Sequence, residues 1–181
     1  MGGDKTNNVK LNHTLKVIAN IFHEENINDW FIFFGTLLGI VRENSCIQGD
    51  DDLDIMINED DYQQIRNAFE KRGHEFIPYR EAAPHRPFKK MLLKSKPTEE
   101  FCTFDLYVCN VNYNGTFYSP WEGTAIRHPY IDVEKKILVK KDWNGTLLNL
   151  PFNFEKKLEH MYGDWRVPQS RRKSKRENDI P

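Results

Sequence analysis

Apolar residues recur every three or four positions near the start of the chain, at Leu11, Leu15, Ile18 and Phe22. This spacing predicts an amphipathic helix over residues 10–25. Residues 58–73 predict a second helix, because acidic residues come first, basic residues come last and Gly73 closes the pattern. Residues 154–162 predict a shorter helix near the end of the chain.

Shorter apolar runs that are rich in aromatic and β-branched residues indicate strands. The expected strands are residues 29–34, 53–57, 88–95, 101–109 and 135–141, with a weaker candidate at 74–79. Gly35 interrupts the first of these runs, and Thr36 is expected to cap a helix over residues 37–43. Strands mixed with helices in this way predict an α/β fold (α+β, with a mixed sheet).

The length of 181 residues suits one domain with one core. We expect that domain to cover residues 1–168, and we expect the basic, polar residues 169–181 to form a disordered tail. The formal net charge of −1 argues against nucleic acid as a partner. The odd count of three cysteines fits a reducing compartment, and no apolar run is long enough for a transmembrane segment, so the expected location is cytoplasmic.

The stretch "GDDDLDIMI", residues 49–57, places four aspartates within five positions at the start of an expected strand. Because side chains alternate between the two faces of a strand, Asp52 and Asp54 share one face while the apolar residues point the other way. The run "FCTFDLYVC" has the same parity, with Asp105 on its polar face. A carboxylate within a buried strand is costly unless something pairs with it.

Side-by-side placement of these two strands would bring Asp52, Asp54 and Asp105 together on one face. Mg²⁺ and Mn²⁺ prefer hard oxygen ligands of this kind. Two such ions about 3.5–4 Å apart can hold the attacking and leaving oxygens of a phosphoryl displacement. We therefore predict that these three residues are both metal ligands and catalytic residues. Asp50 and Asp51 are expected to precede the strand and to orient neighbouring groups or the acceptor.

The segment "FFGTLLG", residues 33–39, lies between the first strand and a helix. Backbone N–H groups at a helix N-terminus attract phosphate. Gly35 would let a phosphate approach the backbone closely, and Thr36 could donate its hydroxyl. Arg42, further along the helix, could bind two phosphate oxygens through its guanidinium group. These three residues are the candidates for binding the phosphates of a donor.

Together these motifs resemble the LicD and fukutin family. The family stretch Gly-Thr-Leu-Leu-Gly, followed by an arginine, matches residues 35–39 and Arg42, and the Asp-Asp-Asp-x-Asp stretch matches residues 50–54. Gln48 and Gly49 stand where the family has Pro-Trp. The closing signature Leu-x-x-x-Tyr-Gly-x-x-W/Y-x-x-Pro is similar to residues 158–168, so the resemblance spans about residues 15–168.

The resemblance implies a nucleotidyltransferase-like fold of the polymerase-beta type. It also implies a metal-dependent transferase that moves phosphocholine or a sugar-alcohol phosphate from a CDP-type donor to a glycan hydroxyl. In the related fold an aspartate assists deprotonation of the acceptor, and this carries over to Asp105, whose segment "TFDLYV" is similar to the strand that supplies the third carboxylate.

Several other interpretations of the aspartates were weighed. A calcium loop is rejected because its sixth position would be Ile55, where glycine is required, and its twelfth would be Asp61, where glutamate is required. A solvated acidic turn would leave Asp105 and the Gly-Thr segment without explanation. A glycosyltransferase with an Asp-x-Asp metal site, transfer of a nucleotide itself from an NTP, and an inactive binding module remain alternatives.

Overall fold

The computed structural model describes residues 8–78, 92–111, 116–118, 128–129, 131–132 and 137–168. Its main sheet has the strand order β1-β2-β4-β5-β6, with β3 also paired to β4. The bounds of these strands are Trp30–Ile32 (β1), Asp52–Asn58 (β2), Leu92–Lys94 (β3), Thr103–Val111 (β4), Thr116–Tyr118 (β5) and His128–Pro129 (β6). β2 and β4 are parallel, whereas β1 runs antiparallel to β2 and β3 runs antiparallel to β4. The predicted mixed sheet is thus confirmed.

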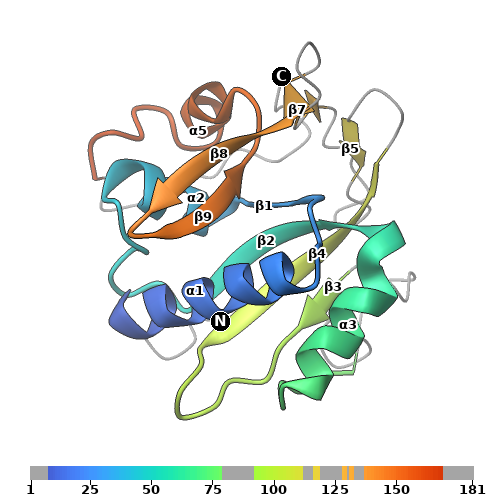
Figure 1. The fold of residues 1–181 in the computed structure, drawn as a ribbon. Coiled ribbons are helices and arrows are strands. Elements are labelled where there is room, and N and C mark those ends of the chain that lie inside the picture. Colours follow the sequence, from blue (N-terminus) through green and yellow to red (C-terminus); the bar gives the residue numbers. More distant parts are fainter. Residues whose placement is uncertain are drawn as a thin grey trace.

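Helices α1 (Asn8–Glu24) and α3 (Tyr62–Lys71) cover the apolar face of this sheet (Figure 1). Phe22 of α1 packs on Phe69 of α3 with ring centroids 5.7 Å apart, and Phe69 lies 5.2 Å from Phe104 of β4. Phe104 is the register partner of Leu53 on β2, and both side chains are fully buried. The alternation seen in the sequence therefore places one side of β2 and β4 in the core.

A second sheet, β7-β8-β9, lies next to β1 and α1, on the side of the molecule that also holds α5 (Figure 1). Its strands are Ile131–Asp132 (β7), Ile137–Trp143 (β8) and Thr146–Leu150 (β9), and α5 is Phe154–Tyr162. The Asn149 side chain of β9 donates to the backbone oxygen of Asn28, 3.2 Å away, just before β1. This contact ties the second sheet to the first. No helix within the described residues is both long and apolar enough to cross a membrane.

Helix α2 (Phe34–Arg42) differs from its expected form. We predicted that Gly35 would end a strand and that Thr36 would cap a helix from residue 37. Instead β1 ends at Ile32, Phe33 occupies the N-cap position without a side-chain cap, and the helix already includes Gly35 and Thr36. The prediction of a Thr36 cap is wrong because the Thr36 hydroxyl accepts a hydrogen bond from β2 instead.

Most other expected elements are confirmed with shifted ends. The helix expected at 58–73 begins with a short 3₁₀ turn, η1 (Glu59–Asp61), and continues as α3, and α5 has the predicted bounds. Residues 74–79 form no strand within the described part, which contains a single bridge between Phe76 and Ser95. β9 was not predicted. The expected tail, residues 169–181, lies outside the described residues.

Candidate active site

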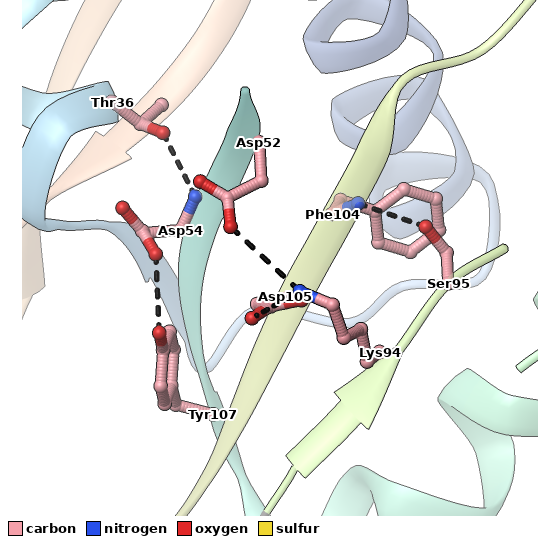
Figure 2. A network of polar contacts seen from close by, with 8 residues as sticks. All are labelled: Thr36, Asp52, Asp54, Lys94, Ser95, Phe104, Asp105 and Tyr107. Atoms are coloured by element: carbon pink, nitrogen blue, oxygen red, sulfur yellow. Dashed lines mark hydrogen bonds and ion pairs between the residues drawn. The ribbon is translucent and has the colours of Figure 1, made fainter. Parts of the chain in front are cut away.

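The start of β2 and the start of β4 bring three aspartates to one face of the sheet (Figure 2). In the parallel register Asp54 stands directly opposite Asp105, and Asp52 stands opposite Thr103. Leu53 and Ile55 on the alternate positions are buried in the core. The predicted adjacency of the two strands is confirmed. Asp105 becomes a neighbour of Asp52 and Asp54, although it lies at least 51 positions further along the chain.

Asp54 is held from both sides. Its backbone N–H donates to the Thr36 hydroxyl oxygen at 2.8 Å, and its Oδ1 accepts a hydrogen bond from the Tyr107 hydroxyl at 3.2 Å (Figure 2). The backbone N–H of Phe33 also donates to the Asp54 backbone oxygen at 3.0 Å. Thr36, only 2% exposed, therefore fixes α2 onto β2.

The turn from β1 into α2 carries backbone strain next to this aspartate. Phe34 has a φ of 43°, in the left-handed region that a bulky residue rarely adopts. Its ring packs edge-on against Tyr107 with centroids 5.6 Å apart, and this is the tyrosine that donates to Asp54. Strained residues of this kind collect at functional sites, where packing offsets their cost. Phe34 was not singled out from the sequence, whereas Tyr107 shares the strand parity of Asp105.

A lysine occupies the same face. Lys94, the last residue of β3, is the register partner of Asp105. Its Nζ lies 2.8 and 3.0 Å from the two oxygens of Asp105 and 3.8 Å from Oδ2 of Asp52 (Figure 2). The Lys94 side chain is 28% exposed and that of Asp105 is 8% exposed. Asp105 is thus paired, although no local pattern distinguished Lys94 from the neighbouring lysines.

The carboxylates are crowded enough to disfavour their ionised forms. Burial, followed by the charge of Asp105, raises the pKa of Asp52 to about 6, although Lys94 opposes this shift. Burial, then Asp52 and Asp105, raise the pKa of Asp54 well above its usual range. Burial likewise raises the pKa of Asp105, against the attraction of Lys94. One ammonium therefore does not compensate the cluster.

Asp50 and Asp51 lie just before β2, as expected, and join the cluster. Asp50, Asp51 and Asp52 can each place an oxygen within 4.8 Å of the others, a spacing suited to a shared cation. Within the described residues, this is the group that meets that spacing, and Asp54 and Asp105 fall outside it. All the donors here are carboxylate oxygens, the set that Mg²⁺ and Mn²⁺ prefer. The chemistry of the cluster therefore fits a divalent cation.

Gly35 and Arg42 are placed apart from each other. Gly35 is buried in the first turn of α2, while Arg42 at its other end pairs with Glu43 and donates to the Trp165 backbone oxygen at 3.4 Å. Arg42 thus fastens the segment after α5 onto α2. The predicted phosphate-binding roles of Gly35, Thr36 and Arg42 remain predictions.

Arg42 also borders a cavity of about 300 Å³. Its lining includes Leu38 and Ile47 on the apolar side and Gln48, Tyr162 and Trp165 around them. The buried Trp165 indole N–H has no hydrogen-bond partner among the described residues. Gln48 is two residues from Asp50, a span of at most about 7 Å. One residue of the cavity lining is therefore close in the chain to the first aspartate of the cluster.

The loop between α2 and β2 is held tightly where it leads to Asp50. The Cys46 backbone N–H donates to Asn12 Oδ1 at 2.8 Å, and the Trp143 indole N–H donates to the Asn44 backbone oxygen at 2.9 Å. A Cβ on Gly39 would lie 2.6 Å from the Ser45 backbone oxygen. The loop thus packs directly on the helix, at a distance that only glycine permits.

A protein-family model matches most of the chain. The family is described as "LicD/FKTN/FKRP, nucleotidyltransferase domain", and the match covers residues 27–153, which include β1, α2, β2 and β4. The resemblance inferred from the Gly-Thr segment and the aspartates is thus confirmed. No curated protein matches the chain.

Three solved structures are similar to this chain at low sequence identity, and the first of them shares its fold. The lincomycin-bound crystal structure of the lincosamide antibiotic adenylyltransferase LnuA has a TM-score of 0.56 and 14% identity, over 82% of each chain. ANT(2")-Ia in complex with adenylyl-2"-tobramycin has a TM-score of 0.43 and 12% identity, over 57% of this chain and 52% of its own. A tRNA nucleotidyltransferase with a primer tRNA and an incoming ATP analogue has a TM-score of 0.40 and 14% identity, over 80% of this chain and 37% of its own.

Proposed function

Since the chain belongs to the LicD/FKTN/FKRP nucleotidyltransferase-domain family, we propose that this transferase moves a substituted phosphate from a CDP-type donor to a glycan hydroxyl. The transferred group would be phosphocholine or a sugar-alcohol phosphate. The observation that carries the proposal is the convergence of Asp52, Asp54 and Asp105 on one face, with too little positive charge to balance them.

We assign Asp52, Asp54 and Asp105 as the ligands of one or two Mg²⁺ or Mn²⁺ ions. When bound, the metal supplies charge stabilisation to the phosphoryl oxygens. Asp50 and Asp51 lie close enough to Asp52 to share this task or to orient the acceptor. Thr36 and Tyr107 fix the position of Asp54, so that alignment of the ligands is built into the sheet before substrate arrives.

The reaction is a displacement at the phosphorus that carries the transferred group. The acceptor oxygen forms a new P–O bond, the bond to the nucleoside monophosphate breaks, and the monophosphate leaves with the bonding electrons. Asp105 takes up the acceptor proton and passes it to solvent. Gly35 and Arg42 remain the assigned contacts for the donor phosphates, together with the hydroxyl proton of Thr36.

The acceptor is proposed to occupy the cavity beside Gln48. Tyr162 and Trp165 offer aromatic surface to a sugar ring, and the Gln48 side-chain amide offers a polar group to its hydroxyls. Hydroxyl-rich ligands with apolar ring faces suit a lining that combines these two kinds of group. Tyr162→Ala and Trp165→Ala are expected to weaken acceptor binding more than donor binding.

A donor screen tests the proposal. CDP-choline, CDP-ribitol, other CDP-alcohols, nucleotide sugars and NTPs are compared by thermal shift with Mg²⁺ or Mn²⁺, since a ligand of the native state raises the melting temperature. The best donor is then incubated with glycan acceptors. Release of a nucleoside monophosphate supports the proposal, and release of pyrophosphate from an NTP would show nucleotidyl transfer instead.

Two other outcomes separate the remaining alternatives. Release of a nucleoside diphosphate from a nucleotide sugar would show glycosyl transfer. Binding of a donor with no turnover against any acceptor, unaffected by Asp54→Ala, would show a binding module that has kept the fold.

A further inference from the structure

We propose that Lys94 is a resident counter-cation that exchanges partners during the reaction cycle. Without metal it pairs with Asp105 and Asp52, and once a divalent cation takes these carboxylates it turns to the donor diphosphate. This inference rests on the proposed function, because it takes both aspartates as metal ligands.

The contacts of Lys94 are those of a placed cation. Its ammonium lies within hydrogen-bonding distance of both Asp105 oxygens and 3.8 Å from Asp52 Oδ2. It thus approaches three oxygens of two proposed ligands (Figure 2). A single positive charge amid several carboxylates is held by whichever of them are closest.

The backbone around Lys94 is held by hydrogen bonds, whereas its side chain is partly exposed and can move. The Lys94 backbone oxygen accepts a hydrogen bond from Ile77 N–H at 2.8 Å. The next residue, Ser95, is buried and exchanges hydrogen bonds with Phe104: its N–H donates to the Phe104 oxygen at 2.9 Å, and its Oγ accepts from the Phe104 N–H at 2.8 Å. The Lys94 side chain is 28% exposed, and its ammonium group is carried on a flexible four-carbon stem. The ammonium can therefore change partners without movement of the strand.

Metal and lysine compete for the same oxygens. Asp105 and Asp52 would hold a divalent cation through the same oxygens, and its charge would repel the Lys94 ammonium from them. The displaced lysine would remain beside the proposed metal ligands, where a metal-bound donor diphosphate would be held, and a lysine ammonium is a common phosphate ligand. The competition gives the site a cation in both states, so that Asp105 is never buried without a partner.

The exchange predicts two effects of opposite sign. In Lys94→Met the metal no longer displaces an ammonium, so we expect Mn²⁺ alone to bind about tenfold more tightly. In the presence of saturating Mn²⁺, we expect the Mn²⁺–pyrophosphate complex to bind about tenfold more weakly, since a phosphate contact is lost. A lysine that served only to hold the fold together would, when replaced, weaken both.

The measurements are calorimetric titrations of Mn²⁺ alone and then of Mn²⁺–pyrophosphate, with Mn²⁺ binding checked by electron paramagnetic resonance. Lys94→Gln is the second variant, because it keeps a hydrogen-bond donor to Asp105 but removes the charge. Lys94→Arg, which keeps the charge, is expected to bind Mn²⁺ like the wild type. Lys96→Met is the matched control, because Lys96 pairs at 2.7 Å with exposed Glu75 instead.

Opposite shifts in both Lys94→Met and Lys94→Gln, absent from Lys96→Met, support the exchange. Unchanged or weaker Mn²⁺ binding in the two neutral variants would overturn the competition, and unchanged pyrophosphate binding would overturn the second half of the cycle. In either case Mn²⁺ binding to the wild type leaves the proposed function standing. A wild-type protein that binds no Mn²⁺ would overturn both proposals.

Discussion

Acidic residues lie at both ends of β2, but their surroundings differ. At the far end, Glu59 and Asp60 are exposed and stand just before α3, where the positive end of the helix dipole favours negative charge. The Asn58 side chain also caps this turn by accepting a hydrogen bond from the Asp60 N–H at 3.2 Å. At the near end, Asp52 and Asp54 face Asp105 across the sheet.

The comparison shows that acidic composition alone does not identify a cation site. At the far end Glu59 and Asp60 are exposed, and Asp61 occupies the N-cap position of α3 without a side-chain cap. Burial, Asp29 and Asp60 also raise the pKa of Asp61. Carboxylates at the near end face one another on the adjacent strands β2 and β4. Burial and mutual repulsion raise their pKa values, because the positive charge of Lys94 is too small to offset both. A site is indicated where the fold brings like charges together at a cost.

The sharpest test of this difference exchanges one carboxylate at each end. Asp54→Asn should lower the transfer rate by about 10³-fold or more, since it removes a ligand and the charge that aligns the phosphate. The melting temperature of the metal-free protein should stay level or rise, because repulsion with Asp52 and Asp105 is relieved. Asp60→Asn is the control and should retain activity. Full activity in Asp54→Asn would contradict the metal mechanism.

The pH dependence of stability should also differ between the ends. A carboxyl whose pKa is raised in the native state binds protons more tightly there than in the unfolded chain. The free energy of unfolding contributed by Asp52 therefore falls as pH rises from about 4, its unfolded pKa, through about 6, its native one. In EDTA, Asp52→Asn should flatten this fall. Mg²⁺ should reduce it as well, since a bound cation favours the ionised form.

Melting curves between about pH 4 and pH 7 provide the measurement, with Asp60→Asn as the comparison. An identical pH slope in the wild type and in Asp52→Asn would show that the near-end carboxylates are not repelling one another in the metal-free protein.

Gly39→Ala should disturb the loop that delivers the near-end aspartates. The added Cβ would meet the Ser45 backbone oxygen and the Ile47 backbone nitrogen at 2.6 and 2.9 Å. Overpacking of this kind costs about 1–3 kcal/mol, so urea unfolding should show that loss. Gly145→Ala offers a comparison, since its Cβ meets nothing within 4 Å and only the positive φ of 78° opposes it. Equal losses would argue against the loop contact.

Removal of the Thr36 hydroxyl should have a smaller but two-sided effect. Thr36→Val leaves the Asp54 N–H without its acceptor, at a cost of about 1–3 kcal/mol in a buried setting. We expect activity to fall as well, by about tenfold, because Asp54 loses part of its support. Thr36→Ser retains the hydroxyl and should recover most of both. If Thr36→Ser behaved like Thr36→Val, the methyl packing and not the hydrogen bond would be responsible.

The smallest expected change is at the far-end cap. Asn58→Ala removes the side-chain acceptor of η1 and should lower the free energy of unfolding by about 1 kcal/mol, the usual worth of an N-cap. Mn²⁺ affinity should not change, and calorimetry can check this. A large loss of Mn²⁺ affinity would show that the two ends of β2 are coupled.

Strand parity was enough to predict the face shared by Asp52, Asp54 and Asp105, because alternation is a local property of an extended chain. The same parity placed Tyr107 beside Asp105. The contact of Lys94 with Asp105 could not be predicted, since it depends on the antiparallel register of β3, which no local pattern fixes. The strained φ of Phe34 was also beyond reach, because an aromatic residue is among the least expected at such a position.

The role of Thr36 shows where a motif can mislead. Its position between a strand and a helix indicated a helix cap, but α2 begins at Phe34, two residues before Thr36, and the Thr36 hydroxyl accepts a hydrogen bond from β2. Tertiary packing decided the outcome, because no local pattern determines how α2 lies against β2. The closing segment, residues 158–168, was interpreted from the resemblance alone, and its attachment to Arg42 became visible only in the structure.

The three cysteines have a practical consequence for the experiments above. Cys46, Cys102 and Cys109 are buried, and burial raises the pKa of the Cys46 and Cys102 thiols to about 12 and about 11. Thiolates are the reactive form, so these two thiols should react very slowly with maleimide reagents near neutral pH. A single cysteine introduced at exposed Leu147 could then carry a fluorophore into an otherwise wild-type chain. The native cysteines should therefore contribute little background labelling, which would allow turnover to be observed in single molecules.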